Sequence, residues 1–336
     1  MSTGFLLRRL ILAIPTLFGV AAIAFVLLRV VPGDPIAMLI GPGASAADIQ
    51  NLRVLYGLDK SILAQFGIYL GNLLHGDFGV SISLRQDVME LILGRLPVTI
   101  ELSLVAMALA ILIGGAMAIS GAYWRRRWPE AAVDAIAGFI MAIPDFLWAL
   151  LFILFVVLFA LSGLPISGRV GPEIDFSAAT NFLLFESLLR LRFDVTGSVL
   201  SHMILPALSL ALPLAAIIAR VLKTSLNEAM TQDYILLARV KGFSRLRTVT
   251  REALRNALVP TVTLTGVQFT FLVGGTVLVE KIFSYPGMGN MAIDAVINRD
   301  LPLIQGLILT FAVLFILINL LVDMSYALLN PRLRRG

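Results

Sequence analysis

The residues of this sequence that could take part in chemistry are few and widely scattered. There is no cysteine, so thiol catalysis, thiolate metal sites and disulfides are excluded. The two histidines, His75 and His202, are far apart, which argues against a histidine-based metal site. The sequence contains no Gly-x-x-x-x-Gly-Lys-Ser/Thr loop for nucleotide phosphates and no Gly-x-Ser-x-Gly or His-Glu-x-x-His signature. We therefore expect no catalytic centre, metal or nucleotide site in this chain.

The polar residues of most interest stand inside long apolar stretches. Glu101 lies between Thr99 and Ser103 near the start of one stretch, and Gln268 lies in the middle of another. Polar side chains at such positions are costly in lipid, and they commonly line a pathway or join two helices. Both roles are open for Glu101, whereas Gln268 is the better candidate for a pathway across the membrane.

The elements that carry these residues are predicted to be membrane helices. Hydrophobic residues make up 59% of the chain and charged residues 14%, with a mean hydropathy of +0.94. Too few polar side chains remain to cover a water-facing surface, and a lipid-facing surface resolves that conflict. A span needs roughly 20 apolar residues. An all-α protein with six spans is therefore predicted, at about Leu10–Val31, Val98–Tyr123, Ala135–Leu161, Leu200–Leu222, Leu258–Val279 and Leu303–Leu329.

The basic residues indicate how the spans are oriented. With the N-terminus placed inside, Lys and Arg gather on the inner segments, including Arg125–Arg127 and the loop 223–257. Because inner loops are enriched in these residues, both termini are predicted to be cytoplasmic, in the plasma or inner membrane. The net charge of +5 is then explained by topology and by contact with lipid, and no nucleic-acid partner is expected.

The first outer loop carries signals for short helices of its own. Ser45–Asp48 is typical of a capping box, with Gly57 as the stop. Ser61–Leu74 is an amphipathic segment, and Gln86–Gly94 is predicted to form a third short helix. We expect residues 1–97 to form an N-terminal span with an extracytoplasmic cap, and residues 98–336 to form a five-helix core. A second outer loop is predicted to hold a helix near Ala178–Leu191.

The longest inner loop, residues 223–257, holds a distinctive pair of short helices. Tyr234–Lys241 is predicted to be helical, with Asp233 near its start and Gly242 as its stop. A second helix, Leu246–Leu258, leads straight towards the fifth span. The order is therefore a short rod, a sharp glycine turn and a basic helix. A DNA-reading helix-turn-helix is a poor alternative, because the second helix continues into the membrane.

This loop resembles the EAA loop of ABC-importer permeases, in which Ala-x-x-x-Gly closes the motif. Ala238 and Gly242 occupy those positions, Leu236-Leu237 stand in place of the usual Glu-Ala, and Val259-Pro260 approximates the closing Leu-Pro. The longer spacing is similar to the dipeptide/oligopeptide/nickel permease family. Further matching segments run along the chain in the same order: Arg29–Pro35, Tyr56–Asp59, Leu74–Ser81, Leu96–Leu102, Glu280–Gly289 and Asn330–Arg332.

The resemblance implies a type I ABC importer permease fold and a set of partners. These are a second homologous permease, two ATP-binding subunits that hold ATP and Mg, and an extracytoplasmic solute-binding protein. The solutes expected are di- and oligopeptides or similar small molecules, and the chain itself would not be an enzyme. The ATPase-coupling helix implied by the resemblance comprises Asp233, Tyr234, Leu237, Ala238, Arg239, Lys241, Gly242 and Phe243, and the possible pathway residues are Glu101 and Gln268.

Two alternatives compete with this interpretation. A secondary transporter driven by an ion gradient is the stronger one, but the two halves show no repeat and the acidic residues form no midplane relay. A membrane enzyme is weaker, because no catalytic constellation occurs. Co-purification of ATPase subunits would separate an ABC permease from both.

Overall fold

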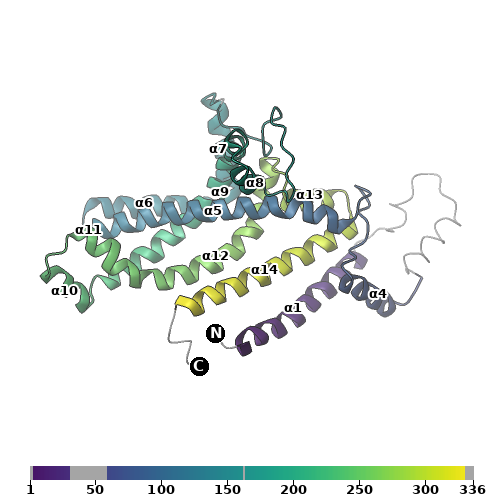
Figure 1. Ribbon diagram of the computed structural model, residues 1–336, viewed down its shortest axis with the longest axis horizontal. Coiled ribbons are helices and arrows are strands. Elements are labelled where there is room, and N and C mark those ends of the chain that lie inside the picture. The colour runs from purple at the N-terminus through teal and green to yellow at the C-terminus, as the bar shows by residue number, and fades with distance from the viewer. Residues whose placement is uncertain (1–2, 31–58, 162, 330–336) are drawn as a thin grey trace. The chain divides into compact units, whose positions relative to one another are not determined.

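The computed structural model describes residues 3–30, 59–161 and 163–329, and helices account for nearly all of their regular structure (Figure 1). Within these residues the β-pairing is a single isolated bridge between Val80 and Asp87. The helices are α1 Thr3–Val30, α4 Ile62–Leu74, α5 Val88–Tyr123, α6 Trp128–Ala142, α7 Asp145–Leu158, α8 Leu183–Leu189, α9 Phe193–Ala229, α10 Asp233–Val240, α11 Arg245–Arg247, a π-helical turn Thr248–Ala253, α12 Leu254–Ile282, α13 Met288–Ile297 and α14 Leu301–Leu329. The predicted helix after Ser45 and most of the segments 29–35 and 56–59 lie outside the described residues, as does 330–332.

The chain divides into two compact units. The first comprises Pro97–Asn290 and the end of α14 from Ile318, and the second comprises α1, residues 59–96 and Met291–Leu317. In the second unit, Phe66 of α4 makes edge contacts with Phe18 and Phe25 of α1. Both units are built from helices, as the composition predicts.

A carboxylate ties the loop before α5 to the start of α14 within the second unit. Asp300 Oδ2 accepts hydrogen bonds from Ser81 Oγ at 2.5 Å, Ser83 Oγ at 2.6 Å and Ser83 N at 2.9 Å. Its other oxygen accepts the N–H of Leu303 at 3.3 Å, which caps α14. Asp300 therefore satisfies both a helix end and a loop.

The core of the first unit is organised around α9, which packs against α12, α6, α7 and α8. Pro206 and Pro213 lie inside this 37-residue helix without ending it. Among the long helices that could cross a membrane, it is the most buried. Prolines are tolerated inside membrane helices because groups on neighbouring helices can satisfy the backbone carbonyl that loses its hydrogen bond.

The count of six spans is not confirmed. Within the described residues, four helices are long and apolar enough to cross a membrane: α5, α9, Arg245–Ile282 and α14. The bent pair α6 and α7 raises the number to five if it counts as one span, and the apolar part of α1, Ile11–Val26, is shorter. An all-α protein with several membrane helices is nevertheless confirmed.

The predicted third span, Ala135–Leu161, is not one straight helix. It breaks between α6 and α7, whose axes differ by 99°. Ile143 is extended, with φ −103° and ψ 120°, and Pro144 precedes the first residue of α7. A proline disfavours helical geometry in the residue before it, so the helix ends there. Trp148 Nε1 donates to the carbonyl of Ile140 across the break, at 3.3 Å.

The short helices of the outer loops agree only in part with prediction. α4 begins after Ser61, whose Oγ accepts the N–H of Ala64, and the chain turns at Gly76 with φ +76°. Gln86–Gly94 is not a separate helix, because its residues from Val88 onward form the first turns of α5. Gly94 and Pro97 weaken a helix but do not end this one. The predicted helix 178–191 is confirmed as the shorter α8.

Adjacent glycines on α5 have different roles. A Cβ at Gly114 would lie 2.5 Å from the backbone oxygen of Ala215 and 3.0 Å from the Cβ of Ile218, both on α9. A Cβ at Gly115 would meet nothing within 4 Å. The sequence predicts close helix packing for both residues, but only Gly114 lies in a close contact between helices.

Replacing Gly114 with alanine is expected to lower the thermal unfolding temperature of the detergent-solubilised chain. The added methyl would force α5 away from α9, and overpacking of this kind costs about 1–3 kcal/mol. Gly115→Ala is the matched control and should unfold at or above the temperature of the native chain, because alanine favours a helix. Equal unfolding temperatures for the two variants would contradict this packing.

Candidate functional site

The short helix predicted at Tyr234–Lys241 is present as α10, and local chemistry defines both of its ends. Asp233 lies in its first turn, where a carboxylate complements the helix dipole. At the other end Gly242 has φ +76°, a backbone conformation that residues with a side chain rarely adopt. The N–H of Gly242 bonds to the oxygen of Arg239 at 2.9 Å, and that of Phe243 to Ala238 at 3.2 Å. These two bonds form a Schellman motif, which confirms the predicted glycine stop.

One face of α10 is anchored in the first unit. Ile235 and Ala238 are buried. Ile235 belongs to an apolar cluster with Ala122 of α5, Leu226 of α9 and Val249 of the π turn. Figure 1 shows α10 and α11 at one end of the long helices α5 and α12.

The opposite face of α10 exposes apolar side chains. Leu237 is 55% exposed and Val240 77%, and Tyr234 and Leu236 are exposed as well. The predicted basic contacts Arg239 and Lys241 are also exposed, as are Asp233 and Gly242. Phe243 is half-buried beneath the guanidinium of Arg247, which lies 3.7 Å from the ring centre. An anchored rod that exposes apolar side chains beside cations is suited to docking on another protein.

The π turn Thr248–Ala253 connects this rod to α12, and sequence reasoning missed it. Val249, Ala253, Ala257 and Thr261 are spaced by four residues, and all are buried. In an α-helix this spacing drifts around the axis, because each residue turns by about 100°. A π turn holds more residues per turn, so each residue rotates by a smaller angle about the helix axis. Between Val249 and Ala253 this smaller rotation offsets the drift of the buried positions. One helix therefore keeps a single buried face from the α10 cluster into the membrane span.

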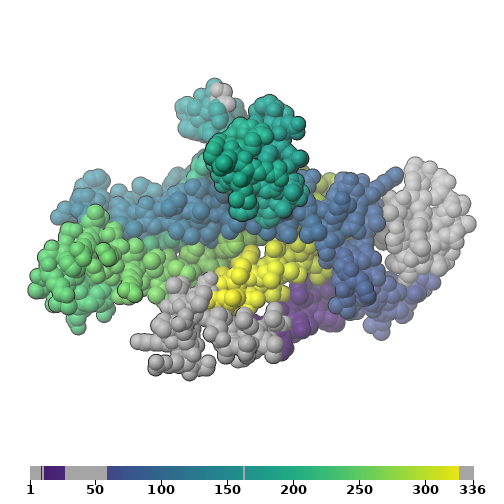
Figure 2. Space-filling view, in the orientation of Figure 1, coloured from purple at the N-terminus to yellow at the C-terminus, as the bar shows by residue number. Residues whose placement is uncertain are grey.

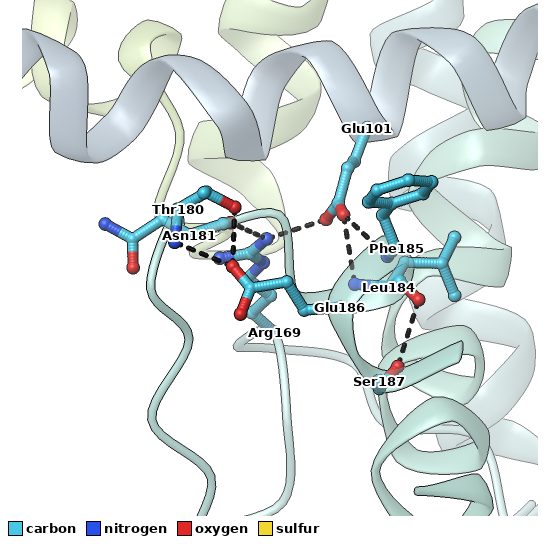
Figure 3. Close-up of polar contacts among 8 residues, drawn as sticks. All are labelled: Glu101, Arg169, Thr180, Asn181, Leu184, Phe185, Glu186 and Ser187. Carbon is cyan, nitrogen blue, oxygen red and sulfur yellow. Dashed lines mark hydrogen bonds and ion pairs between the residues drawn. The ribbon is translucent and has the colours of Figure 1, made fainter. Parts of the chain in front are cut away.

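Glu101, a predicted pathway residue, lies in a buried polar cluster (Figure 3). Its Oε2 accepts a charge-assisted bond from Arg169 Nη2 at 2.7 Å, and its Oε1 accepts the N–H groups of Leu184 and Phe185 at 3.0 and 3.2 Å. The same Nη2 of Arg169 donates to the oxygen of Asn181 at 2.7 Å. Glu101 therefore joins α5 to the start of α8 and to the loop before it.

A second buried carboxylate, Glu280, lies where α12 meets α13. Thr99 Oγ1 donates to Glu280 Oε1 at 2.7 Å and accepts the N–H of Met288 at 2.9 Å. Glu280 Oε2 accepts the N–H groups of Gly289 and Asn290 at 2.8 and 3.1 Å. A Cβ at Gly289 would lie 2.5 Å from the Cα of Val277. These contacts explain why the segment Glu280–Gly289 has a carboxylate at its start and a glycine at its end, although sequence reasoning assigned no role to Glu280.

An apolar cavity of about 460 Å³ lies among α5, α9, α12 and the end of α14. Neither predicted pathway residue lines it, and Gln268 is half-buried elsewhere on α12. The pathway roles of Glu101 and Gln268 therefore stay predictions. The residues that line the cavity include Met107, Gly115, Ile218, Thr265, Gly266 and Val322.

These features define a class: a multi-span helical membrane protein with a short, anchored helix whose exposed face is apolar and basic. Residues 110–335 match the family described as "Binding-protein-dependent transport system inner membrane component". Residues 2–103 match "Binding-prot-dependent transport system membrane comp, N-term". The chain is 39% identical over 336 residues to the "Putative peptide transport system permease protein" of Brucella melitensis biotype 1, covering 99% of each. It is 37% identical over 331 residues to the "Glutathione transport system permease protein GsiC" of Escherichia coli (strain K12), covering 98% of this chain and 99% of that one.

The chain therefore belongs to the family of binding-protein-dependent transport system inner membrane components, which are the permeases of ABC importers. This confirms the resemblance drawn from the inner loop. The alternative of an ion-driven secondary transporter is excluded. The chain is located in a membrane, where it is a transport component with several spans.

Replacing Arg169 with methionine should destabilise the first unit, because Glu101 would be left charged and buried without its cation. Losing one partner of such a pair typically costs about 3–5 kcal/mol. The double variant Glu101→Gln with Arg169→Met removes both charges and keeps an acceptor for Leu184, so it should recover most of the loss. Thermal unfolding in detergent measures both effects. An Arg169→Met protein as stable as the native one would refute the structural role of this pair.

Proposed function

We propose that this chain is one of two permease subunits of an ATP-driven importer for peptides or similarly small solutes. The single observation that carries the proposal is α10, an anchored helix whose exposed face is apolar and basic, within a chain of this permease family. The solute class rests on the names of the relatives, one described for peptide and one for glutathione transport. Glutathione is itself a small peptide, so both names point to the same chemistry.

In this proposal α10 docks on an ATP-binding subunit. Leu237 and Val240 would enter an apolar groove, and Arg239 and Lys241 would meet acidic residues at its rim. ATP and Mg would be held by the two ATP-binding partners, because this chain has no phosphate loop. The basic residues around α10 support a cytoplasmic position for it, and hence cytoplasmic termini.

Movement of the ATP-binding subunits would reach the membrane through the π turn. α10 packs on Val249 through Ile235, and the same helix continues without interruption into α12. Rotation or displacement of α10 would therefore be passed to the wall of the apolar cavity, which α12 helps to form. The solute would be delivered by an extracytoplasmic binding protein, and the bundle would alternate between two states.

The proposal is tested by uptake into proteoliposomes that contain the complete importer. Uptake of a labelled dipeptide, oligopeptide or glutathione should require both the solute-binding protein and internal ATP, and the permease chain alone should not hydrolyse ATP. A proton or sodium uncoupler should leave uptake unchanged while ATP is present. Uptake that stops with the uncoupler, or ATP hydrolysis by the rigorously purified chain, would argue against it.

Val240→Asp should detach the ATP-binding subunits without unfolding the chain. Val240 is 77% exposed, so its replacement removes little buried contact, but the carboxylate would enter the proposed apolar groove. We expect loss of the ATP-binding subunits in pull-downs, together with loss of transport. Leu84→Asp is the control, because Leu84 is a 49% exposed apolar residue of the second unit. If Val240→Asp retains the ATP-binding subunits as Leu84→Asp does, the docking face has been misplaced.

A further inference from the structure

The short helix α8 is arranged inside out. Its polar residues Glu186 and Ser187 are buried, whereas Phe185 is 59% and Leu189 67% exposed. The exposed apolar surface includes Leu188 and continues past the helix through Leu191 and Phe193. In the space-filling view the teal segment around α8 stands out from the visible face (Figure 2). A helix in water would have the opposite pattern.

Hydrogen bonds hold the polar residues of α8 inward. Glu186 accepts the N–H of Ala179 at 2.9 Å, both the N–H and the hydroxyl of Thr180, and Nη2 of Arg190 at 3.0 Å. The Thr180 hydroxyl is the largest of the effects that hold the pKa of Glu186 at about 2, so this carboxylate is charged at neutral pH. Ser187 accepts from Thr196 at 2.9 Å.

The start of α8 is held in place as well. Glu101 accepts the N–H groups of Leu184 and Phe185 (Figure 3). Rotating α8 to hide its leucines would break these bonds and those of Glu186, and would leave buried charges without partners. The apolar face is therefore held outward by the fold and is not a mobile segment caught in one position.

The surroundings of this face indicate what covers it. α8 leads directly into the span α9, whose first residue, Phe193, is 68% exposed and is followed on the same helix by the 44% exposed Leu200. The apolar surface of α8 is thus continuous along the chain with that of a membrane helix. Arg190 and Arg192 lie at its border with their side chains half-exposed, and each forms an ion pair, with Glu186 and Asp194 respectively.

We propose that α8 lies in the membrane interface, with Phe185, Leu188 and Leu189 against phospholipid acyl chains. Arg190 and Arg192 then lie at the level of the lipid phosphates, with their apolar stems along the chains, as long basic side chains do at interfaces. The outer loop that the sequence predicts around this helix therefore rests on the bilayer and anchors the start of α9. This proposal is independent of the coupling role of α10.

The test uses a nitroxide label at Leu189→Cys in the complete importer, reconstituted in phospholipid. The chain has no cysteine of its own, so the label is unique within it; partner cysteines are replaced. Frequent collision of the nitroxide with oxygen indicates that the label lies in lipid, and frequent collision with a water-soluble nickel chelate indicates that it lies in water. Leu200→Cys on α9 is the lipid control, and Glu173→Cys, an exposed residue of the loop before α8, is the water control.

We expect the label at position 189 to shift towards oxygen and away from the nickel chelate, as at position 200 and opposite to position 173. Accessibility to nickel as high as at position 173 would show that α8 stands in water. Low accessibility to both reagents would show that a protein partner covers it. Either result overturns the proposal. A label at Leu191→Cys repeats the measurement if the first variant does not fold.

Discussion

Close packing against α9 is possible because one face of this helix is lined with small side chains. Ala207, Ala211, Ala215 and Ala219 recur every four residues and are almost completely buried. In lipid there is little hydrophobic force between helices, so close van der Waals contact must hold them together. Gly114 on α5 completes the fit where its backbone meets Ala215. The remaining features of the first unit depend on this close packing.

Towards α10, the packing around α9 continues as a mixed apolar cluster. Leu222 and Leu226 of α9 extend the buried surface to Ile235, so α10 is held by the bundle and not by its loop alone. Near α13 and α8, buried carboxylates hold the helices together. Glu101 joins α5 to the start of α8, and Glu280 joins the end of α12 to α5 and to the start of α13. Each has its oxygens satisfied by hydroxyl, guanidinium or backbone donors. Buried carboxyl groups with satisfied oxygens favour one arrangement strongly, because losing any partner is costly.

The departures from regular helix have definite causes and consequences. Pro144 ends α6 and lets α7 turn by 99°, whereas the π turn keeps a buried stripe aligned without ending its helix. The first redirects the chain within the bundle, and the second preserves continuity between α10 and α12. α8 shows how the fold can override local polarity: buried bonds to Glu186 outweigh the exposure of its leucines, provided that lipid covers them.

The sequence by itself determined the properties that depend on local chemistry. Apolar length predicts membrane helices, and the αL conformation available to glycine predicts the stop at Gly242. The absence of a phosphate loop and the order of motifs along the chain point to a permease. Only the tertiary structure decided which prolines break a helix, because Pro206 is buried inside the continuous helix α9, whereas Ile143 before Pro144 is extended and a new helix begins after that proline. It also decided that Glu101 pairs with Arg169, since such a bond depends on how distant segments meet and leaves no periodic trace in the chain.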